Sequence, residues 1–216
     1  MNSIMEAVCQ VCNATRQQTK HGVIFHNLLT QLRRNFRRHD FEIKIKTMRH
    51  KTLNGEEFYV NAYYDPEDDH QKEVPIEVVI HHNFDSHAIW DIKHITELLV
   101  QVFDAVVHEF KHQRQSRKRN FKTYWHNHSY LDDPDEIDAY AVSIAIELCR
   151  SLGKYRALRY MHRFTSLGRL KLHHNYVSPN LSSYIETFNK SPKILKLMAK
   201  KVYVRIQKLD MDCIFL

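Results

Sequence analysis

The chain has 216 residues with a hydrophobic share of 43%, which is enough apolar side chain for one compact globular core. Its formal net charge is +7, and it contains only 4 Gly and 5 Pro, so collagen-like, linker-like and low-complexity architectures are excluded. No stretch approaches the roughly 18 consecutive apolar residues of a membrane span, and the first residues do not form a signal sequence. We therefore expect a soluble cytoplasmic protein that is not secreted and has no membrane partner.

The N-terminal part of the chain predicts a helix followed by a small antiparallel sheet. The helix is expected over at least 23–38, because its apolar residues recur at helical spacing. An Asn-Gly pair at 54–55 predicts a hairpin turn between the first two strands. Strands are expected over 41–47, 57–64 and 75–82.

Four cysteines suit a reducing compartment in which thiols stay free. Cys9 and Cys12 have the CxxC spacing, but no second pair follows, and the other two are Cys149 and Cys213. The N-terminal setting of the pair looks helical. We therefore expect buried thiols there rather than a zinc knuckle.

The most informative segment reads His-Glu-Phe-Lys-His over 108–112, the HExxH pattern. The preceding residues, 95–107, are apolar at helical spacing and contain no Gly or Pro, so the motif is predicted to lie on a buried helix. Residues four apart share a helix face, which lets His108 and His112 bind one Zn²⁺. Glu109 would then act as the general base towards a water beside the metal.

A catalytic zinc usually takes three protein ligands, so a third is needed from elsewhere. Asp133 and Pro134 are typical of an N-cap and a first helical position, which places Glu136 in the first turn of a second helix. The following residues, 139–148, include an apolar face of small side chains that could pack on the HExxH helix. Glu136 is therefore the favoured third ligand.

These two segments, HEFKH at 108–112 and PDEIDAYA at 134–141, resemble the gluzincin metallopeptidases, and look most like the small HExxH peptidases encoded by tailed bacteriophages. The resemblance covers about 41–150. It implies an α+β, zincin-like fold with one Zn²⁺ per chain. For a phage-encoded protein, it implies a location in the host cytoplasm.

Under this resemblance the two motif histidines and Glu136 match the ligand positions, and Glu109 matches the general base. One position departs from the pattern. Many gluzincins have an aspartate four residues after the ligand glutamate, where this chain has Tyr140. Asp104, one turn before the first histidine, is a candidate for the missing role of orienting a zinc histidine.

The resemblance also implies a domain organisation. A single zincin-like domain is expected over 1–216, with 1–112 as an upper half that contains the sheet and the HExxH helix, and 113–216 as a mostly helical lower half. In such a fold an edge strand pairs with the extended substrate peptide, and we expect that edge over 74–82.

The C-terminal third, 154–216, predicts helices broken near the Ser-Pro pairs at 178–179 and 191–192. Its last helical segment, from Ile194 onward, is amphipathic and basic. We expect its apolar face to pack in the core, in preference to lying on a membrane surface.

A different ligand scheme stays open. His126 and His128 follow the HExxH helix, and a third histidine at such a distance is what SprT-like DNA-associated proteases use. The same two histidines could instead stabilise the substrate oxyanion. Tyr124, Tyr130 and Tyr140 compete for that role, and the residues do not rank them.

A cluster of basic residues after the motif adds a secondary hypothesis. Such clusters attract nucleic acid or acidic protein surfaces, although a solvated loop is the more common explanation. The residues of this cluster are Arg114, Arg117, Lys118, Arg119 and Lys122.

The sequence thus predicts a zinc-dependent endopeptidase whose partner is a protein or peptide substrate, with nucleic acid as a less favoured partner. Two alternatives remain: a SprT-like DNA-associated metalloprotease with a third histidine ligand, and a catalytically silent phage structural or DNA-binding protein on a zincin scaffold.

Overall fold

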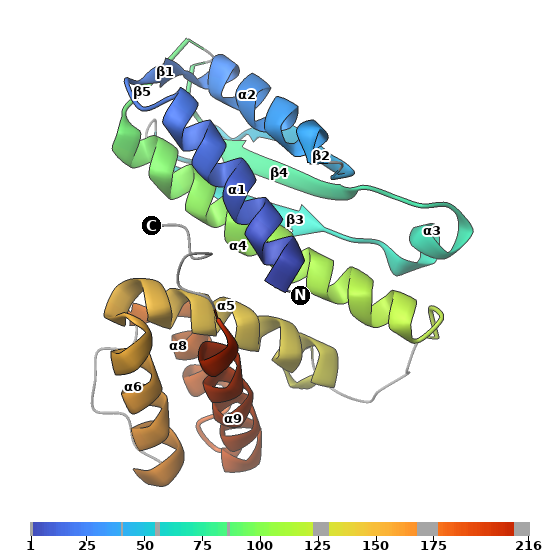
Figure 1. Cartoon of the computed structure of the whole chain (residues 1–216), viewed down its shortest axis with the longest axis vertical. Coiled ribbons are helices and arrows are strands. Elements are labelled where there is room, and N and C mark those ends of the chain that lie inside the picture. The colour runs from blue at the N-terminus through green and yellow to red at the C-terminus, as the bar shows by residue number, and fades with distance from the viewer. Residues whose placement is uncertain are drawn as a thin grey trace. The chain divides into compact units, whose positions relative to one another are not determined.

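The computed structural model describes residues 2–39, 41–54, 57–85, 87–122, 130–167 and 177–209. The protein belongs to the α+β class and is mostly helical with a small sheet, as predicted (Figure 1). Contacts divide the chain into two compact units, Met1–Lys122 and Thr123–Ile214. The single-domain organisation stays a prediction. The predicted division into halves at residue 112 also stays a prediction.

The first unit contains the predicted helix and sheet together with an additional N-terminal helix. The predicted helix over 23–38 begins two residues later than expected, because Val23 and Ile24 form a short strand. The elements in chain order are α1 (Asn2–Gln18), β1 (Val23–Ile24), α2 (Phe25–Arg38), β2 (Ile43–Arg49), β3 (Phe58–Tyr63), α3 (Pro66–Gln71), β4 (Ile76–His82), β5 (Ile89–Trp90) and α4 (Ile92–Lys118).

The order of the main sheet is β2-β4-β3, which differs from the expected order. β4 is parallel to β2, with Ile45 opposite Val78, and antiparallel to β3, with Val60 opposite Ile80. The predicted hairpin between the first two strands is therefore wrong, and the sheet is mixed. The predicted edge over 74–82 is also wrong, since β4 is central. The side chains of β4 are buried on both faces of the sheet, as a central strand requires. In β2 only Ile45 is buried.

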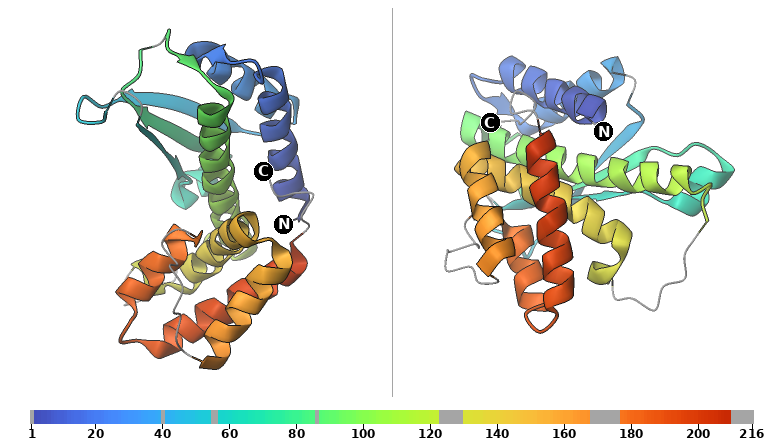
Figure 2. Two further views of the ribbon diagram at one scale, coloured as in Figure 1. Left: turned by 90° about the vertical axis from the view of Figure 1, so that its left-hand side faces the viewer. Right: turned by 60° about the horizontal axis from the view of Figure 1, so that its bottom comes forward.

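Helices cover one face of this sheet. α2 packs on β2, α4 packs on β3 and β4, and α1 packs on both helices (Figure 2). Ile76, Val78 and Ile80 are almost completely buried in the sheet. Tyr59 and Tyr63, four residues apart along β3, are 40% and 54% exposed. The alternation of β3 therefore separates a core face from an open face.

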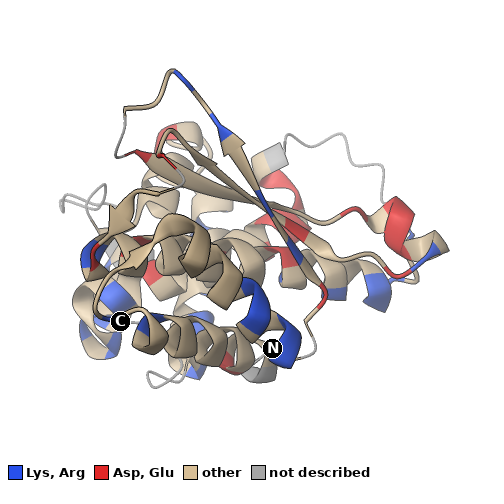
Figure 3. Ribbon diagram, turned by 90° about the horizontal axis from the view of Figure 1, so that it is seen from above, with Lys and Arg blue, Asp and Glu red and all other residues tan. Residues whose placement is uncertain are grey.

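An ion pair ties α3 to the last turn of α4. The side chain of Asp69 is 1% exposed, and Arg117 donates to its two carboxylate oxygens at 2.9 Å each. Tyr64 Oη donates to Asp69 at 2.8 Å, and Arg117 also pairs with Glu73 at 3.1 Å. These bonds, led by the one from Arg117, hold the pKa of Asp69 below its usual value. The acidic helix and the basic helix end lie together in Figure 3.

Asp69→Asn is expected to lower the free energy of unfolding by about 2 kcal/mol near neutral pH, because it weakens charge-assisted hydrogen bonds to a buried carboxylate. The folded-state pKa of Asp69 is lowered, so its contribution is present above the unfolded-state pKa and is lost as the pH falls through the folded-state pKa. The difference between wild type and variant should therefore shrink as the pH falls below about 4. Urea unfolding followed by circular dichroism at several pH values measures it.

The matched control is Asp68→Asn, on the same helix but exposed, which should change stability little. Equal effects of the two substitutions, or a difference that grows in acid, would contradict a stabilising ion pair at Asp69.

The second unit is helical in its described part. α5 packs against η1, α6, α8 and α9. Its N-cap is Asp133, whose carboxylate accepts from the backbone N–H of Asp135 at 2.7 Å, and Pro134 opens the helix, as predicted. Gly153, with φ of 75°, ends it. The elements are η1 (Tyr130–Asp132), α5 (Pro134–Leu152), α6 (Lys154–Leu167), α8 (Pro179–Thr187) and α9 (Pro192–Lys208).

The predicted breaks at the two Ser-Pro pairs are confirmed. Ser178 caps α8 by accepting from the backbone N–H of Leu181 at 3.1 Å, and Pro192 begins α9. A buried apolar face on α9, as expected, packs in the core of the unit through Met198 and Val202, both 0% exposed.

The described cysteines are buried free thiols, as predicted for the N-terminal pair. Cys12 is 0% exposed, and burial raises the pKa of its thiol. Burial likewise raises the pKa of Cys9. Cys213 lies outside the described residues.

Candidate metal centre

The HExxH motif lies on α4, as predicted. This helix begins where Asp91 accepts from the backbone N–H of His94 at 2.9 Å, and it runs to Lys118 without a break. Its buried side chains include Leu98, Val102 and Val106, one turn apart along one face. The buried face anchors the helix against α1 and the sheet, and so fixes the backbone that carries the motif.

The two motif histidines converge within the first unit. His108 Nε2 and His112 Nε2 lie 3.0 Å apart, and the two rings are nearly edge to face, with centroids 4.8 Å apart. Both side chains are half-buried. The pair results from helix geometry, since residues four apart lie one above the other.

This separation fits two ligands of one ion. Two histidine nitrogens bound tetrahedrally to zinc, each at about 2.0–2.1 Å, lie about 3.4 Å apart. The observed 3.0 Å between the Nε2 atoms of His108 and His112 needs to widen by only a few tenths of an ångström. Small side-chain rotations of two half-buried rings can supply that change.

Glu109 follows the first histidine directly and is half-buried. Successive residues are about 100° apart around a helix, so Glu109 lies beside the face that carries the imidazoles. A carboxylate at this position can take a proton from a water held near those rings.

Glu136 lies in the first turn of α5, within the second unit. Its surroundings in that unit are acidic and aromatic. Tyr184, 0% exposed, donates from Oη to the carbonyl of Leu131 at 2.9 Å and packs edge to face on Tyr140. Burial, followed by the charges of Tyr140, Glu136 and their neighbours, raises the pKa of Tyr184. Glu136 is thus held on a helix start that is fixed by a cap and by a buried tyrosine.

The remaining candidates of the sequence analysis are placed in part. Asp104 is half-buried on α4, one turn before His108, and its role in orienting a zinc histidine stays a prediction. Tyr140 packs on Tyr184, and its catalytic role also stays a prediction. Three candidates lie outside the described residues: Tyr124, His126 and His128. The side chain of Tyr130 also lies outside the part of the chain that the structure describes.

The basic cluster at the end of α4, which we name the α4 patch, consists of Arg114, Arg117, Lys118, Arg119 and Lys122. α4 extends through Lys118, so most of the α4 patch is helix rather than loop. Arg117 is engaged by Asp69 and Glu73, and its charge is balanced within the unit. Arg114, Lys118 and Lys122 are exposed. Nucleic-acid binding by the patch stays a prediction, with Arg117 mainly in a structural role.

Two residues were missed from the sequence. Asp69 resembled a surface acid in the run Asp65–Asp69, and its buried ion pair depends on a partner 48 residues away. Tyr184 had no local motif. Only its apolar neighbours in α8 indicated burial.

Comparison with protein-family models, curated proteins and solved structures gives no match to this chain. Among the helices in the described ranges, none is long and apolar enough to cross a membrane.

Proposed function

We propose that the protein is a zinc-dependent endopeptidase of gluzincin type. The observation that carries the proposal is the 3.0 Å separation of His108 Nε2 and His112 Nε2 on one face of α4, with Glu109 next to the first histidine. Two neutral imidazoles are ligands that zinc prefers, and a glutamate beside them supplies the base that peptide hydrolysis needs.

Glu136 is the third ligand in this proposal. In this proposal His108 and His112 of the first unit and Glu136 of the second unit would bind the same metal ion. Histidine nitrogens together with one carboxylate oxygen are a known ligand set of catalytic zinc, and three protein ligands leave one position for water or substrate. The ligand carboxylate would come from the capped first turn of α5, where the helix dipole also favours negative charge.

The residues would divide the chemistry as follows. His108 and His112 would hold the metal through Nε2, and Glu136 would hold it through a carboxylate oxygen. Glu109 accepts a proton from the attacking water as the water oxygen bonds to the scissile carbonyl carbon. Glu109 then donates that proton to the amine nitrogen as the C–N bond breaks. When bound, zinc polarises the carbonyl and lowers the pKa of water towards about 7.

The zinc content of the purified protein tests the first part of the proposal. Wild type, dialysed after exposure to zinc, should hold about one zinc ion per chain by elemental mass spectrometry. His112→Ala should lose it, because two remaining ligands bind weakly. His26→Ala is the matched control, since His26 is exposed on α2. Wild type without zinc, or a His112→Ala variant that keeps zinc, would contradict the proposal.

A further inference from the structure

The surface built by α6 and α9 is strongly basic. These two helices pack against each other within the second unit, and they contain lysine and arginine but no aspartate or glutamate. On most helices, cationic side chains are interspersed with acidic ones. A surface that carries only positive charge therefore indicates an anionic partner. The basic residues are Lys154, Arg156, Arg159, Arg163, Lys193, Lys196, Lys200, Lys201, Arg205 and Lys208.

Six of these side chains form two exposed stripes with the same spacing. The positions in each stripe follow i, i+3 and i+7, which keeps the three charges on one face of the helix. All six are exposed. We name them the α6 stripe (Arg156, Arg159, Arg163) and the α9 stripe (Lys193, Lys196, Lys200).

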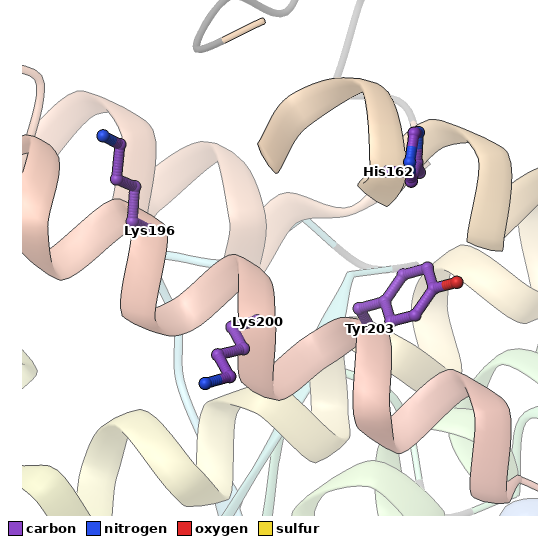
Figure 4. A pocket seen from close by; sticks show the side chains of 4 residues that line it. All are labelled: His162, Lys196, Lys200 and Tyr203. Carbon is purple, nitrogen blue, oxygen red and sulfur yellow. The ribbon is translucent and has the colours of Figure 1, made fainter. Parts of the chain in front are cut away.

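The α9 stripe borders a hollow in this surface. A cavity of about 390 Å³ is lined by His162 from α6 and by Lys196, Lys200 and Tyr203 from α9 (Figure 4). The lining of this hollow is mostly apolar, and Figure 4 shows the ammonium groups of Lys196 and Lys200 pointing away from His162.

The charges of the stripes are not neutralised by ion pairs with other described residues. Asp138 of α5 pairs instead with Lys201 at 3.4 Å and with Arg205 at 2.8 Å, both on the half-buried side of α9. Lys201 and Arg205 therefore stabilise the unit, whereas the residues of the α9 stripe face solvent and form no ion pair with another described residue.

Aromatic side chains accompany these charges. Tyr155, on the α6 surface, is 71% exposed, and the guanidinium carbon of Arg159 lies 5.8 Å from the centre of its ring. Tyr203 lines the hollow. An exposed aromatic ring beside cations is a platform on which an unpaired base can stack, while the cations bind the adjoining phosphates.

We propose that the α6–α9 surface binds single-stranded nucleic acid, with the two stripes on the phosphates and Tyr155 stacked on a base. A duplex offers phosphates but keeps its bases stacked, so it would leave Tyr155 unused. A membrane surface fits less well, because the apolar side of α9, including Met198, Val202 and Ile206, is buried in the unit and is not available for insertion. The proposal does not depend on the metal site.

The test uses the full chain and a fluorescein-labelled oligothymidylate of about 20 nucleotides, with binding measured by fluorescence anisotropy. Lys196→Glu/Lys200→Glu should weaken binding by at least about tenfold at low salt. Because two phosphate contacts are lost, the slope of log K against log salt concentration should become less negative by about 1.4. Tyr155→Ala should weaken binding about fivefold or more and leave the salt dependence unchanged. Circular dichroism confirms that each variant is folded.

Two matched variants make the result specific. Lys51→Glu/Lys72→Glu reverses two exposed charges in the first unit and should change affinity less than about threefold. Lys118→Glu/Lys122→Glu measures the separate contribution of the α4 patch to binding. The proposal is overturned if the α9 double variant loses no more affinity than the Lys51→Glu/Lys72→Glu control, if a duplex of equal length binds as tightly as the single strand, or if vesicles of anionic phospholipid compete the oligonucleotide away.

Discussion

Glu109→Gln is expected to lower the rate of peptide hydrolysis by at least about a hundredfold while zinc stays bound. Glutamine keeps the shape of the side chain but cannot accept a proton from water or pass one to the leaving amine. The two imidazoles that converge at 3.0 Å are untouched, so the metal should remain. Digestion of a denatured protein mixture, with new N-termini counted by mass spectrometry, measures the rate without a known substrate.

Glu97→Gln is the matched control, because Glu97 is exposed on the same helix, three turns before the motif. It should leave hydrolysis unchanged. If wild type and Glu109→Gln cleave equally, the cleavage comes from a contaminant or from another centre. If zinc-loaded wild type cleaves no protein in the mixture, the catalytically silent alternative is favoured over the peptidase.

The second large effect is expected at the third ligand. Glu136→Gln should reduce the zinc content from about one per chain to well below half under the same dialysis, because a neutral amide is a poor zinc ligand. Asp135→Asn is the control, since Asp135 is an acid in the same first turn of α5. The control should keep its zinc. Elemental mass spectrometry on the three proteins gives the comparison.

The same measurement separates the two ligand schemes. His126→Ala/His128→Ala should keep its zinc if Glu136 is the third ligand. Zinc that survives Glu136→Gln but is lost in the double histidine variant would assign the third ligand to 126–128 and favour the SprT-like alternative. Zinc that is lost only with the motif histidines would leave the peptidase without a third protein ligand and contradict the gluzincin assignment.

The helices that carry the candidate site were predicted well, because their signals are local. Asp133 and Pro134 marked the start of α5, and the apolar spacing of 95–107 marked the body of α4. The α4 helix nevertheless extends through part of the basic segment that was expected to be a connector. Charge and polarity alone did not distinguish a solvated helix from a loop.

The sheet was predicted less well. The alternation of apolar and polar residues identified the strands. It indicates on which face of the sheet a side chain lies, but it does not indicate which strand is the neighbour. The Asn54-Gly55 pair therefore led to a hairpin, whereas β4 inserts between β2 and β3. The run Ile76–Ile80, with Val78 and Val79 buried on opposite faces, was the available sign of a central strand.

Local sequence is enough to place His108 and His112 on one face of a helix beside Glu109, because helix geometry within one turn is dictated by local hydrogen bonding. Which charges are neutralised and which face solvent depends on the packing of the elements. Arg117 finds Asp69 across 48 positions of the chain, and Asp138 selects Lys201 and Arg205 while the α9 stripe stays exposed. Such pairings depend on how the elements pack, and no local pattern of residues encodes them.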